Sequence, residues 1–189
     1  FIDAIDSKNI DKHDHYQIQL QDNKILKYND VRKFGSIHWT KDIDNHFLIK
    51  NLGPEPLSKE FNGVFLKDKC RNRNVAIKNL IMNQSIIVGV GNIYACEALY
   101  MSSIRPDKKC KYITLKQCDN LVKSIKYVLK KSIKSGGTTL KDFKTLDGSP
   151  GYFKQKLMIY DCKVCKCGMK VKNIKLGGRS SFYCNVCQK

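Results

Sequence analysis

The cysteines are the residues of this sequence whose type and spacing point most directly to chemistry. Five of the nine fall within residues 162–189. Cys162 and Cys165 form one Cys-x-x-Cys pair, Cys184 and Cys187 form a second, and 18 residues separate the two pairs. Each pair can place two thiolates on one ion while the intervening stretch forms a hairpin, which is typical of a tetrahedral zinc site. We therefore expect one closed, structural zinc site with four protein ligands.

Two alternatives to this ligand set are open in the sequence. Cys167 is a third upstream thiol that can replace Cys162 or Cys165. A redox pair is the second alternative, and it is disfavoured because two Cys-x-x-Cys pairs are redundant for exchange chemistry. The odd number of cysteines and their local crowding favour a reducing, intracellular protein over a secreted disulfide scaffold.

An arginine is expected at the tip of the hairpin between the two cysteine pairs. Arg179 follows Gly177 and Gly178. A metal-stapled hairpin that displays an arginine can push a cation into a DNA groove or onto a phosphate. A solvated loop arginine is the equally simple alternative.

A second phosphate-binding candidate lies upstream. Gly89 and Gly91 precede a helix that is expected to start near Asn92, where backbone N–H groups can hold a phosphate. The pattern lacks the full dinucleotide fingerprint, so a nucleic-acid phosphate is favoured. Lys78, on the preceding helix, can join the same phosphate.

A third candidate joins cations to an aromatic ring. Arg32, Lys33 and Phe34 occur together at an expected turn. An aromatic wedge can enter a base stack while a cation fills the space of a displaced base. A core phenylalanine beside surface charges is the structural alternative.

The charge of the chain favours a polyanionic partner. Lys and Arg number 35 against 17 acidic residues, which gives a formal net charge of +18. Nucleic acid is the first candidate and an anionic membrane surface the second, while a merely basic soluble protein is the alternative. No apolar run approaches the roughly 20 residues that span a bilayer.

The elements that must position these residues follow the order strands, helices and a cysteine-bearing tail. Alternation over 16–20 and a return over 25–30 predict a hairpin from Tyr16 to Tyr28, and 34–39 reads as a further strand. Helical periodicity covers 58–135, and Ser58 is expected to begin the first helix. The longest predicted helix has an apolar stripe formed by Leu115, Cys118, Leu121, Val122, Ile125, Val128, Leu129 and Ile133.

Several of these stretches occur together, in this order, in one known family. They are "KHDHYQIQL", "YNDVRKFG", "LGPEPLSKEFN", "AIKNLIMNQSIIVGVGNIYACEALY", "GGTTLKDF", "GYF" and "SFYCNVCQK". Over essentially its whole length the chain resembles bacterial formamidopyrimidine-DNA glycosylases, with endonuclease VIII as a near neighbour. "GPEPL" and "GGTTLKDF" favour the formamidopyrimidine branch.

The resemblance implies an α+β fold. Residues 1–50 would be the C-terminal part of an N-terminal β-sandwich catalytic domain, and 51–57 a linker. Residues 58–154 would be a helix–two-turn–helix DNA-binding domain with a loop that covers the lesion, and 155–189 a β-hairpin zinc finger.

The resemblance also implies base-excision repair. Family members flip oxidised purines such as 8-oxoguanine and formamidopyrimidines out of the duplex, excise them, and nick the strand by β,δ-elimination as lyases for apurinic or apyrimidinic sites. The implied partner is damaged double-stranded DNA, and the implied cofactor is one structural Zn²⁺. The implied protein is a cytoplasmic, nucleoid-associated monomer without a membrane partner.

The family's DNA-binding residues carry over to particular positions. Arg32 and Phe34 match the wedge that fills the gap left by the flipped base and inspects the opposite base. His13 and Arg73 match other DNA-contacting positions.

Further positions match residues around the lesion. Lys78 and Asn92 match residues that grip the phosphates, and Arg179 matches an arginine that holds the same phosphates and donates a proton in δ-elimination. Thr138 and Thr139 fall in the loop that covers the flipped base.

Two departures from the family pattern limit these expectations. The family's nucleophile is an N-terminal proline amine, followed by a glutamate, whereas this sequence begins "FIDAIDSKNIDKHDH", which aligns past both. We therefore expect DNA binding without base excision from this 189-residue chain. The other departure is "YDCKVCKCG", where the family spacing counted back from Cys184 points to Cys167, but the intact motif points to Cys162 and Cys165, which we take as ligands.

Two other functions compete with the repair enzyme. One is a non-catalytic, damaged-DNA-binding zinc protein derived from the family. The other is a zinc-ribbon module that binds RNA or protein.

Overall fold

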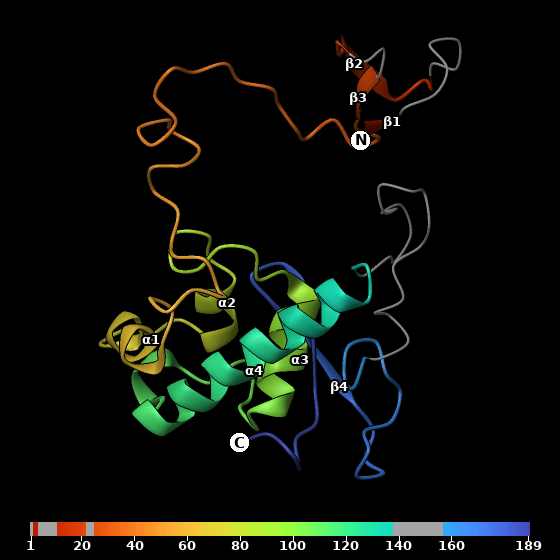
Figure 1. Ribbon diagram of the computed structural model, residues 1–189. Helices are drawn as coiled ribbons and strands as arrows, with labels where there is room; N and C mark the ends of the chain where they lie inside the picture. The colour runs from red at the N-terminus through yellow and green to blue at the C-terminus, as the bar shows by residue number, and fades with distance from the viewer. Residues whose placement is uncertain (1, 4–10, 22–24, 138–156) are drawn as a thin grey trace.

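The computed structural model describes residues 2–3, 11–21, 25–137 and 157–189. Figure 1 shows a small sheet near the N-terminus, a long extended segment, a group of helices, and a hairpin that lies beside the helices. The described residues therefore contain both helices and strands, in the order expected from the sequence.

The N-terminal sheet has three antiparallel strands in the order β1-β3-β2. They are β1 (Ile2–Asp3), β2 (Asp14–Gln19) and β3 (Ile25–Asn29). Tyr16 pairs with Tyr28, so the predicted hairpin is confirmed in its register. Whether this sheet is part of a β-sandwich stays a prediction.

The predicted strand over 34–39 is wrong: these residues form no strand, and a side chain organises the backbone that leads into them. Asp30 accepts hydrogen bonds from the backbone N–H groups of Arg32 (3.0 Å), Lys33 (2.9 Å) and Gly35 (2.8 Å). Lys33 has a φ of 55°, in the left-handed region. This local turn satisfies donors that a strand would direct to a neighbouring strand.

The segment expected to be a linker is attached to the helices at its glycine. The backbone N–H of Gly53 donates to the carbonyl of Gln84 at 2.8 Å. A Cβ on Gly53 would lie 2.4 Å from the carbonyl carbon of Ile86, so only glycine permits this approach. Residues 51–57 therefore lead the extended segment into the helical group at a fixed point.

The helical group contains four α-helices and one short 3₁₀ helix among the described residues. These are α1 (Gly63–Cys70), α2 (Ile77–Ile81), α3 (Asn92–Met101), η1 (Cys110–Tyr112) and α4 (Leu115–Lys134). Helix α4 packs on α1 and α3, and α2 packs on α3. The fully buried side chains of Phe61, Leu66, Leu99 and Leu121 lie in the shared core.

Side-chain caps explain where two of these helices begin. Asn62 accepts from the backbone N–H of Phe65, so α1 starts at Gly63 and not near Ser58, whose hydroxyl donates to Glu60 instead. Thr114 and Gln117 form a reciprocal capping box at the start of α4. The predicted stripe on α4 is buried except for Leu115 and Ile133 at its two ends, which are exposed.

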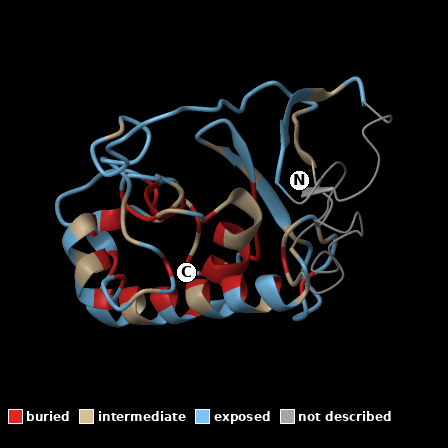
Figure 2. Ribbon diagram, turned by 45° about the horizontal axis from the view of Figure 1, so that its top comes forward, coloured by how far each residue is buried: buried red, intermediate tan, exposed pale blue. Residues whose placement is uncertain are grey.

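The tail folds into the predicted hairpin. Strands β4 (Lys172–Leu176) and β5 (Arg179–Tyr183) pair antiparallel around Gly177 and Gly178. Both glycines have positive φ, 55° and 76°, as a two-residue hairpin turn of this kind requires. Figure 2 shows that burial is concentrated in the helices and in the part of the tail beside them.

Candidate nucleic-acid interface and cysteine cluster

Four cysteines of the tail form a cluster. The sulfur atoms of Cys165, Cys167, Cys184 and Cys187 all lie within 4.8 Å of one another. Cys165 and Cys187 are 3.8 Å apart, and Cys167 and Cys184 are 3.6 Å apart. A tetrahedral zinc site with zinc–sulfur distances of about 2.3 Å has sulfur atoms about 3.8 Å apart, so this geometry fits one such ion.

This cluster corrects the expected ligand set in one position. The set predicted from the sequence included Cys162 and held Cys167 as the alternative, but the structure brings Cys167 into the cluster and leaves Cys162 outside it. The Cys162 thiol faces the carbonyl of Tyr160 at 3.8 Å, and burial raises its pKa. Cys162 is therefore held as a neutral thiol.

A tight turn explains why Cys167 takes this place. The N–H of Cys165 donates to the carbonyl of Met169 (2.8 Å), and the N–H of Gly168 donates to the carbonyl of Cys165 (2.9 Å). Gly168 has a φ of 85°, which the turn requires. The turn places the thiols of Cys165 and Cys167 on the same side. The count back from Cys184 in the family pattern was thus the better guide than the Cys-x-x-Cys motif.

Hydrogen bonds favour the thiolate form of Cys165, whereas hydrogen bonds with the other thiols of the cluster help to raise the pKa of Cys187 to about 12. Burial alone would raise the pKa of Cys165, but hydrogen bonds from the Cys167 backbone and the Tyr100 hydroxyl help to lower that pKa to about 6. The Tyr100 oxygen lies 3.2 Å from the Cys165 sulfur. The thiolate is the form that binds a metal, so this environment suits a soft divalent cation.

Helix α3 carries the beginning of the cysteine module, which we define as residues 157–189. The buried carboxylate of Glu97 accepts from three consecutive backbone N–H groups, those of Met158 (2.8 Å), Ile159 (2.9 Å) and Tyr160 (2.9 Å). Ile159 is fully buried and packs with Cys96 of α3. The start of the module is therefore fixed to α3 by both polar and apolar contacts.

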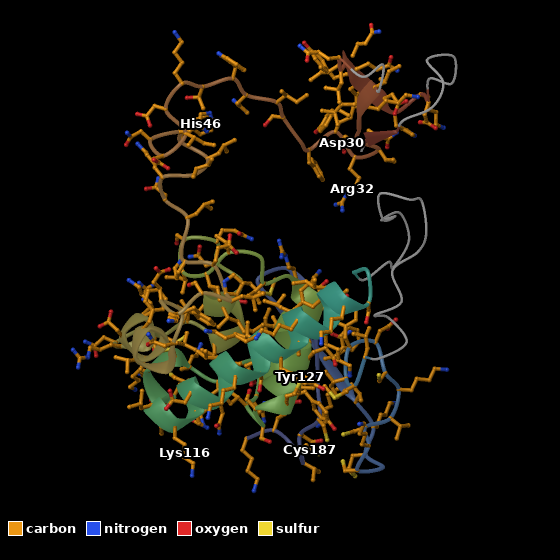
Figure 3. All side chains as sticks on the ribbon, in the orientation of Figure 1. Asp30, Arg32, His46, Lys116, Tyr127 and Cys187 are labelled. Carbon is orange, nitrogen blue, oxygen red and sulfur yellow. The ribbon has the colours of Figure 1, made fainter. Side chains whose placement is uncertain are left out.

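The end of the module is fixed to the loop after α3. Gln188 is 1% exposed; its side chain accepts from the N–H of Cys184 (2.9 Å) and donates to the carbonyl of Ile104 (2.8 Å). The N–H of Lys189 donates to the carbonyl of Ser103 at 3.0 Å. Figure 3 shows Cys187 close to the helical group, below α3 in this view.

The predicted phosphate-gripping residues come together from three elements. Lys78 of α2 donates from its ammonium to the side-chain oxygen of Asn92, the first residue of α3, at 2.5 Å. The Asn92 amide donates to the carbonyl of Ser180 on β5 at 3.1 Å. The exposed Arg179 precedes Ser180 at the hairpin tip and is close enough to influence the charge of Lys78. The structure thus joins Lys78 directly to Asn92, and both side chains donate to the carbonyl of Ser180, the residue after Arg179.

The ammonium of Lys78 is unusually buried for a lysine. Its side chain is 0% exposed. Burial lowers the pKa of Lys78, the Cys96 thiol opposes this shift, and the Arg179 charge adds to it. A phosphate brought to this place would favour the charged form.

The residues predicted to form the wedge lie in the turn organised by Asp30. Phe34 is 82% exposed, and the guanidinium of Arg32 stacks 5.1 Å from the centre of its ring. An exposed aromatic ring excludes the alternative of a core phenylalanine in this structure. Figure 3 labels Asp30 and Arg32 beside the N-terminal sheet, away from α4.

The other predicted DNA-contacting residues lie in separate places. His13 precedes β2, and its carbonyl accepts from the N–H of Asp30 at 3.0 Å. Arg73 is exposed in the turn after α1, where its carbonyl accepts from the N–H of Lys111 at 3.1 Å. Thr138 and Thr139 lie outside the described residues. The predicted DNA contacts of all four stay predictions.

Four residues that position the site were missed in the sequence. They are Glu97, Tyr100, Gln188 and Ser181, whose hydroxyl accepts from the Lys78 ammonium at 2.6 Å. Glu97 carries the only retrospective signal, an acid on the otherwise apolar stretch "ACEALY", where a buried charge needs partners. The others are ordinary polar residues whose partners are distant in sequence.

Comparisons with known proteins agree with this arrangement. Residues 52–144 match the family described as the formamidopyrimidine-DNA glycosylase H2TH domain. The formamidopyrimidine-DNA glycosylase of Haemophilus influenzae (strain PittEE) is 50% identical over 183 residues, which cover 95% of this chain and 68% of that protein. That of Glaesserella parasuis serovar 5 is 50% identical over 187 residues, 97% of this chain and 68% of the relative.

Solved structures give the same result. The complex between a mutant FPG of Lactococcus lactis and a Fapy-dG containing DNA matches with a TM-score of 0.86 and 32% identity, covering 97% of this chain and 69% of that one. The MutM (FPG) protein of Thermus thermophilus matches with a TM-score of 0.85 and 29% identity, covering 95% and 70%. Within the described residues, no helix is long and apolar enough to cross a membrane.

Proposed function

This chain belongs to the formamidopyrimidine-DNA glycosylase family of base-excision repair proteins, and on that premise we propose that it grips the backbone of damaged double-stranded DNA around a lesion. The observation that carries the proposal is the contact of the Lys78 ammonium with Asn92 at the start of α3, where both side chains donate to the carbonyl of Ser180, the residue after Arg179. Three cationic or amide side chains around one helix N-terminus suit an anionic phosphate.

The surrounding charge supports the same partner. The net charge of +18 favours association with a polyanion, and binding would weaken steeply with salt as phosphate contacts release counterions. The exposed Phe34 and Arg32 would enter the gap left by a flipped base. His13, Arg73, Thr138 and Thr139 would add contacts on either side of it.

We assign one structural Zn²⁺ to the cysteine cluster. Cys165, Cys167, Cys184 and Cys187 would hold the ion, which would cross-link the two ends of the hairpin. A closed set of four thiolates offers no position for water, so the ion would stabilise the fold and would not take part in hydrolysis. Its contribution would be to fix the hairpin that presents Arg179.

The reaction of the whole family member would be removal of oxidised purines and strand nicking by β,δ-elimination, with Arg179 as the proton donor in δ-elimination. The prolines of these 189 residues, at positions 54, 56, 106 and 150, would not supply the terminal amine that attacks the sugar in the family. We propose that the 189-residue polypeptide, tested by itself, binds damaged DNA as a monomer without excising the base.

Binding is tested by fluorescence anisotropy with a duplex containing a tetrahydrofuran abasic analogue and with the undamaged duplex of the same sequence. The lesion duplex should bind more tightly. Lys78→Ala, Asn92→Ala and Arg179→Ala should each weaken binding by roughly 10-fold, and the two cation variants should reduce the salt slope by about 1. Lys116→Ala, a change of an exposed lysine on α4, is the matched control and should change affinity by less than about 2-fold.

Equal binding of the two duplexes, or equal affinity of Lys78→Ala and Lys116→Ala, would contradict the proposal. Borohydride trapping on a duplex containing 8-oxoguanine tests the lack of excision separately. No covalent adduct is expected from the 189-residue chain, and an adduct would show that another amine acts as the nucleophile.

A further inference from the structure

The Lys78 ammonium uses all of its protons within the protein. It donates to the Asn92 side chain (2.5 Å), to the carbonyl of Ser180 (3.0 Å) and to the hydroxyl of Ser181 (2.6 Å). An ammonium has three N–H donors, so these oxygens satisfy it, and a phosphate would act on Lys78 through its charge or by replacing one of them. Among the described residues, no carboxylate forms an ion pair with Lys78. Three neutral oxygens, with the neighbouring Cys96 thiol, therefore hold this buried cation.

Two of the three acceptors belong to β5, about 100 residues further along the chain. Ser181 is itself 0% exposed. Its hydroxyl donates to the carbonyl of Arg179 (3.3 Å), which directs its lone pairs to Lys78, and its N–H donates to the side chain of Asn173 (3.2 Å). Contacts within the hairpin thus orient the Ser181 hydroxyl toward the Lys78 ammonium.

The tip of the hairpin also lies against α2. A Cβ on Gly177 would lie 3.1 Å from the side-chain oxygen of Asn79, the residue after Lys78. Gly177 has a φ of 55°, so the turn and the close approach both favour glycine. The backbone of the tip and the side chain of Ser181 therefore meet α2 together.

We propose that Ser181 is a positioning residue for Lys78, and that Lys78 is held at Asn92 only while the cysteine module is folded. The inference rests on the proposed function. It adds that the proposed phosphate-binding group of Lys78, Asn92 and Arg179 also requires a folded cysteine module. A folded hairpin would supply Arg179 and at the same time hold the lysine that acts with it.

The proposal has a direct chemical consequence. Removing the Ser181 hydroxyl leaves the three protons of a buried ammonium with two oxygen acceptors and the weakly accepting Cys96 thiol, which is unfavourable. Lys78 then moves toward solvent or gives up its proton, and either change makes its amine more reactive. Ser180 contributes only its backbone carbonyl, so replacing its side chain should leave Lys78 unchanged.

The experiment compares Ser181→Ala with Ser180→Ala in the zinc-loaded chain. An amine-acylating succinimidyl ester modifies the protein, and mass spectrometry of peptides gives the rate at each lysine. We expect Lys78 to react about 3- to 10-fold faster in Ser181→Ala and at the wild-type rate in Ser180→Ala. Lys126, which donates to the carbonyl of Ser58 at 2.6 Å, is the internal reference and should not change.

Metal removal gives a second readout. Treating the wild-type chain with a zinc chelator should raise the reactivity of Lys78 and leave that of Lys126 unchanged. An equal rise at both lysines would indicate general unfolding and would count against the local hold. If the acylation rate of Lys78 did not rise after complete metal loss, the proposal that its position depends on the folded cysteine module would be overturned.

DNA binding separates this proposal from the proposed function. Ser181→Ala should bind the tetrahydrofuran duplex about 3- to 10-fold more weakly, and Ser180→Ala within about 2-fold of wild type. Unchanged Lys78 reactivity in Ser181→Ala would overturn the positioning role, whatever the affinity. Absence of DNA binding by the wild-type chain would overturn the proposed function instead.

Discussion

Apolar side chains are exposed in one part of this molecule and buried in the other. In the N-terminal part, residues 2–52 of the described structure, Trp39 is 93% exposed and Phe34 82% exposed. In the helical group and cysteine module, Phe61 and Leu66 are 0% exposed. A single sheet with an extended segment offers one layer, whereas helices α1 to α4 cover one another from several sides. An apolar residue type therefore becomes a core residue only where a second layer covers it.

The two parts also differ in what fixes their backbone. The turn after β3 depends on one half-buried carboxylate, that of Asp30, and its neighbours in sequence. The helical group and the module depend on buried groups far apart in sequence, such as Glu97 with Ile159 and Gln188 with Ile104. Loss of a single group should therefore have local effects in the first part and wider effects in the second.

The largest effect is expected at the cysteine cluster, and it tests the corrected ligand set. Cys167→Ser should lower zinc affinity by two orders of magnitude or more, because it removes one of four thiolates. Cys162→Ser is the matched control and should keep one zinc per chain, because Cys162 lies outside the cluster. Competition with a coloured chelator measures both affinities. Zinc loss from Cys162→Ser and not from Cys167→Ser would restore the ligand set expected from the motif.

A pair of core and surface substitutions tests the comparison of the two parts directly. Leu66→Ala should lower the free energy of unfolding by about 2–5 kcal/mol, because it removes a fully buried side chain. Trp39→Ala should change it by less than about 0.5 kcal/mol. Trp39 is the only tryptophan, so urea unfolding is followed by circular dichroism. A large loss with Trp39→Ala would show that the exposed segment is covered in solution.

A smaller effect is expected where α3 meets the cluster. Tyr100→Phe removes the hydroxyl that lies 3.2 Å from the Cys165 sulfur and should speed chelator-driven zinc release by about 10-fold. Tyr94→Phe makes the same change on the same helix, where the hydroxyl contacts Ser132 at 2.9 Å, and should release zinc at the wild-type rate. Equal release rates for the two variants would mean that the Tyr100 hydroxyl does not support the site.

The smallest effect is expected at Asp30 on acidification. Hydrogen bonds from the N–H groups of Gly35, Arg32 and Lys33 lower the pKa of Asp30 below its usual value of 3.8. A lowered pKa in the folded state means that the turn is stabilised at neutral pH and loses this contribution as pH falls below about 4. The amide chemical shift of Gly35 should follow this titration while amides of α4 stay unchanged. Asp30→Asn should remove the transition, and simultaneous changes in α4 would show that the two parts respond together.

Patterns within a short stretch were predictable from the sequence. The register of Tyr16 with Tyr28, the start of α3 at Asn92 and the position of Arg179 at the hairpin tip all follow from alternation, helical spacing and paired glycines. No strand forms over 34–39, and at its start the Asp30 side chain binds the N–H of Gly35, as it binds those of Arg32 and Lys33 just before the segment. Apolar alternation alone carries no information about such a competing acceptor.

The arrangement of the site was less predictable because it depends on distant partners. The Cys-x-x-Cys spacing favoured Cys162 over Cys167, but the turn from Cys165 to Met169 brings Cys167 into the cluster instead. The roles of Ser181 and Gln188 depend on Lys78 and Ile104, which lie 103 and 84 residues away. The resemblance supplied Lys78, Asn92 and Arg179 as a group, but not the groups that hold them together.

The same separation in sequence sets the order in which the site can form during synthesis. Helices α1 to α4 have their core partners within residues 61–129 and can pack as soon as that stretch has left the ribosome. Lys78 must wait for Ser181, and its ammonium stays in water until the hairpin folds onto α2 and α3. The grip proposed for DNA is therefore the last part of the helical group to be completed on a newly made chain.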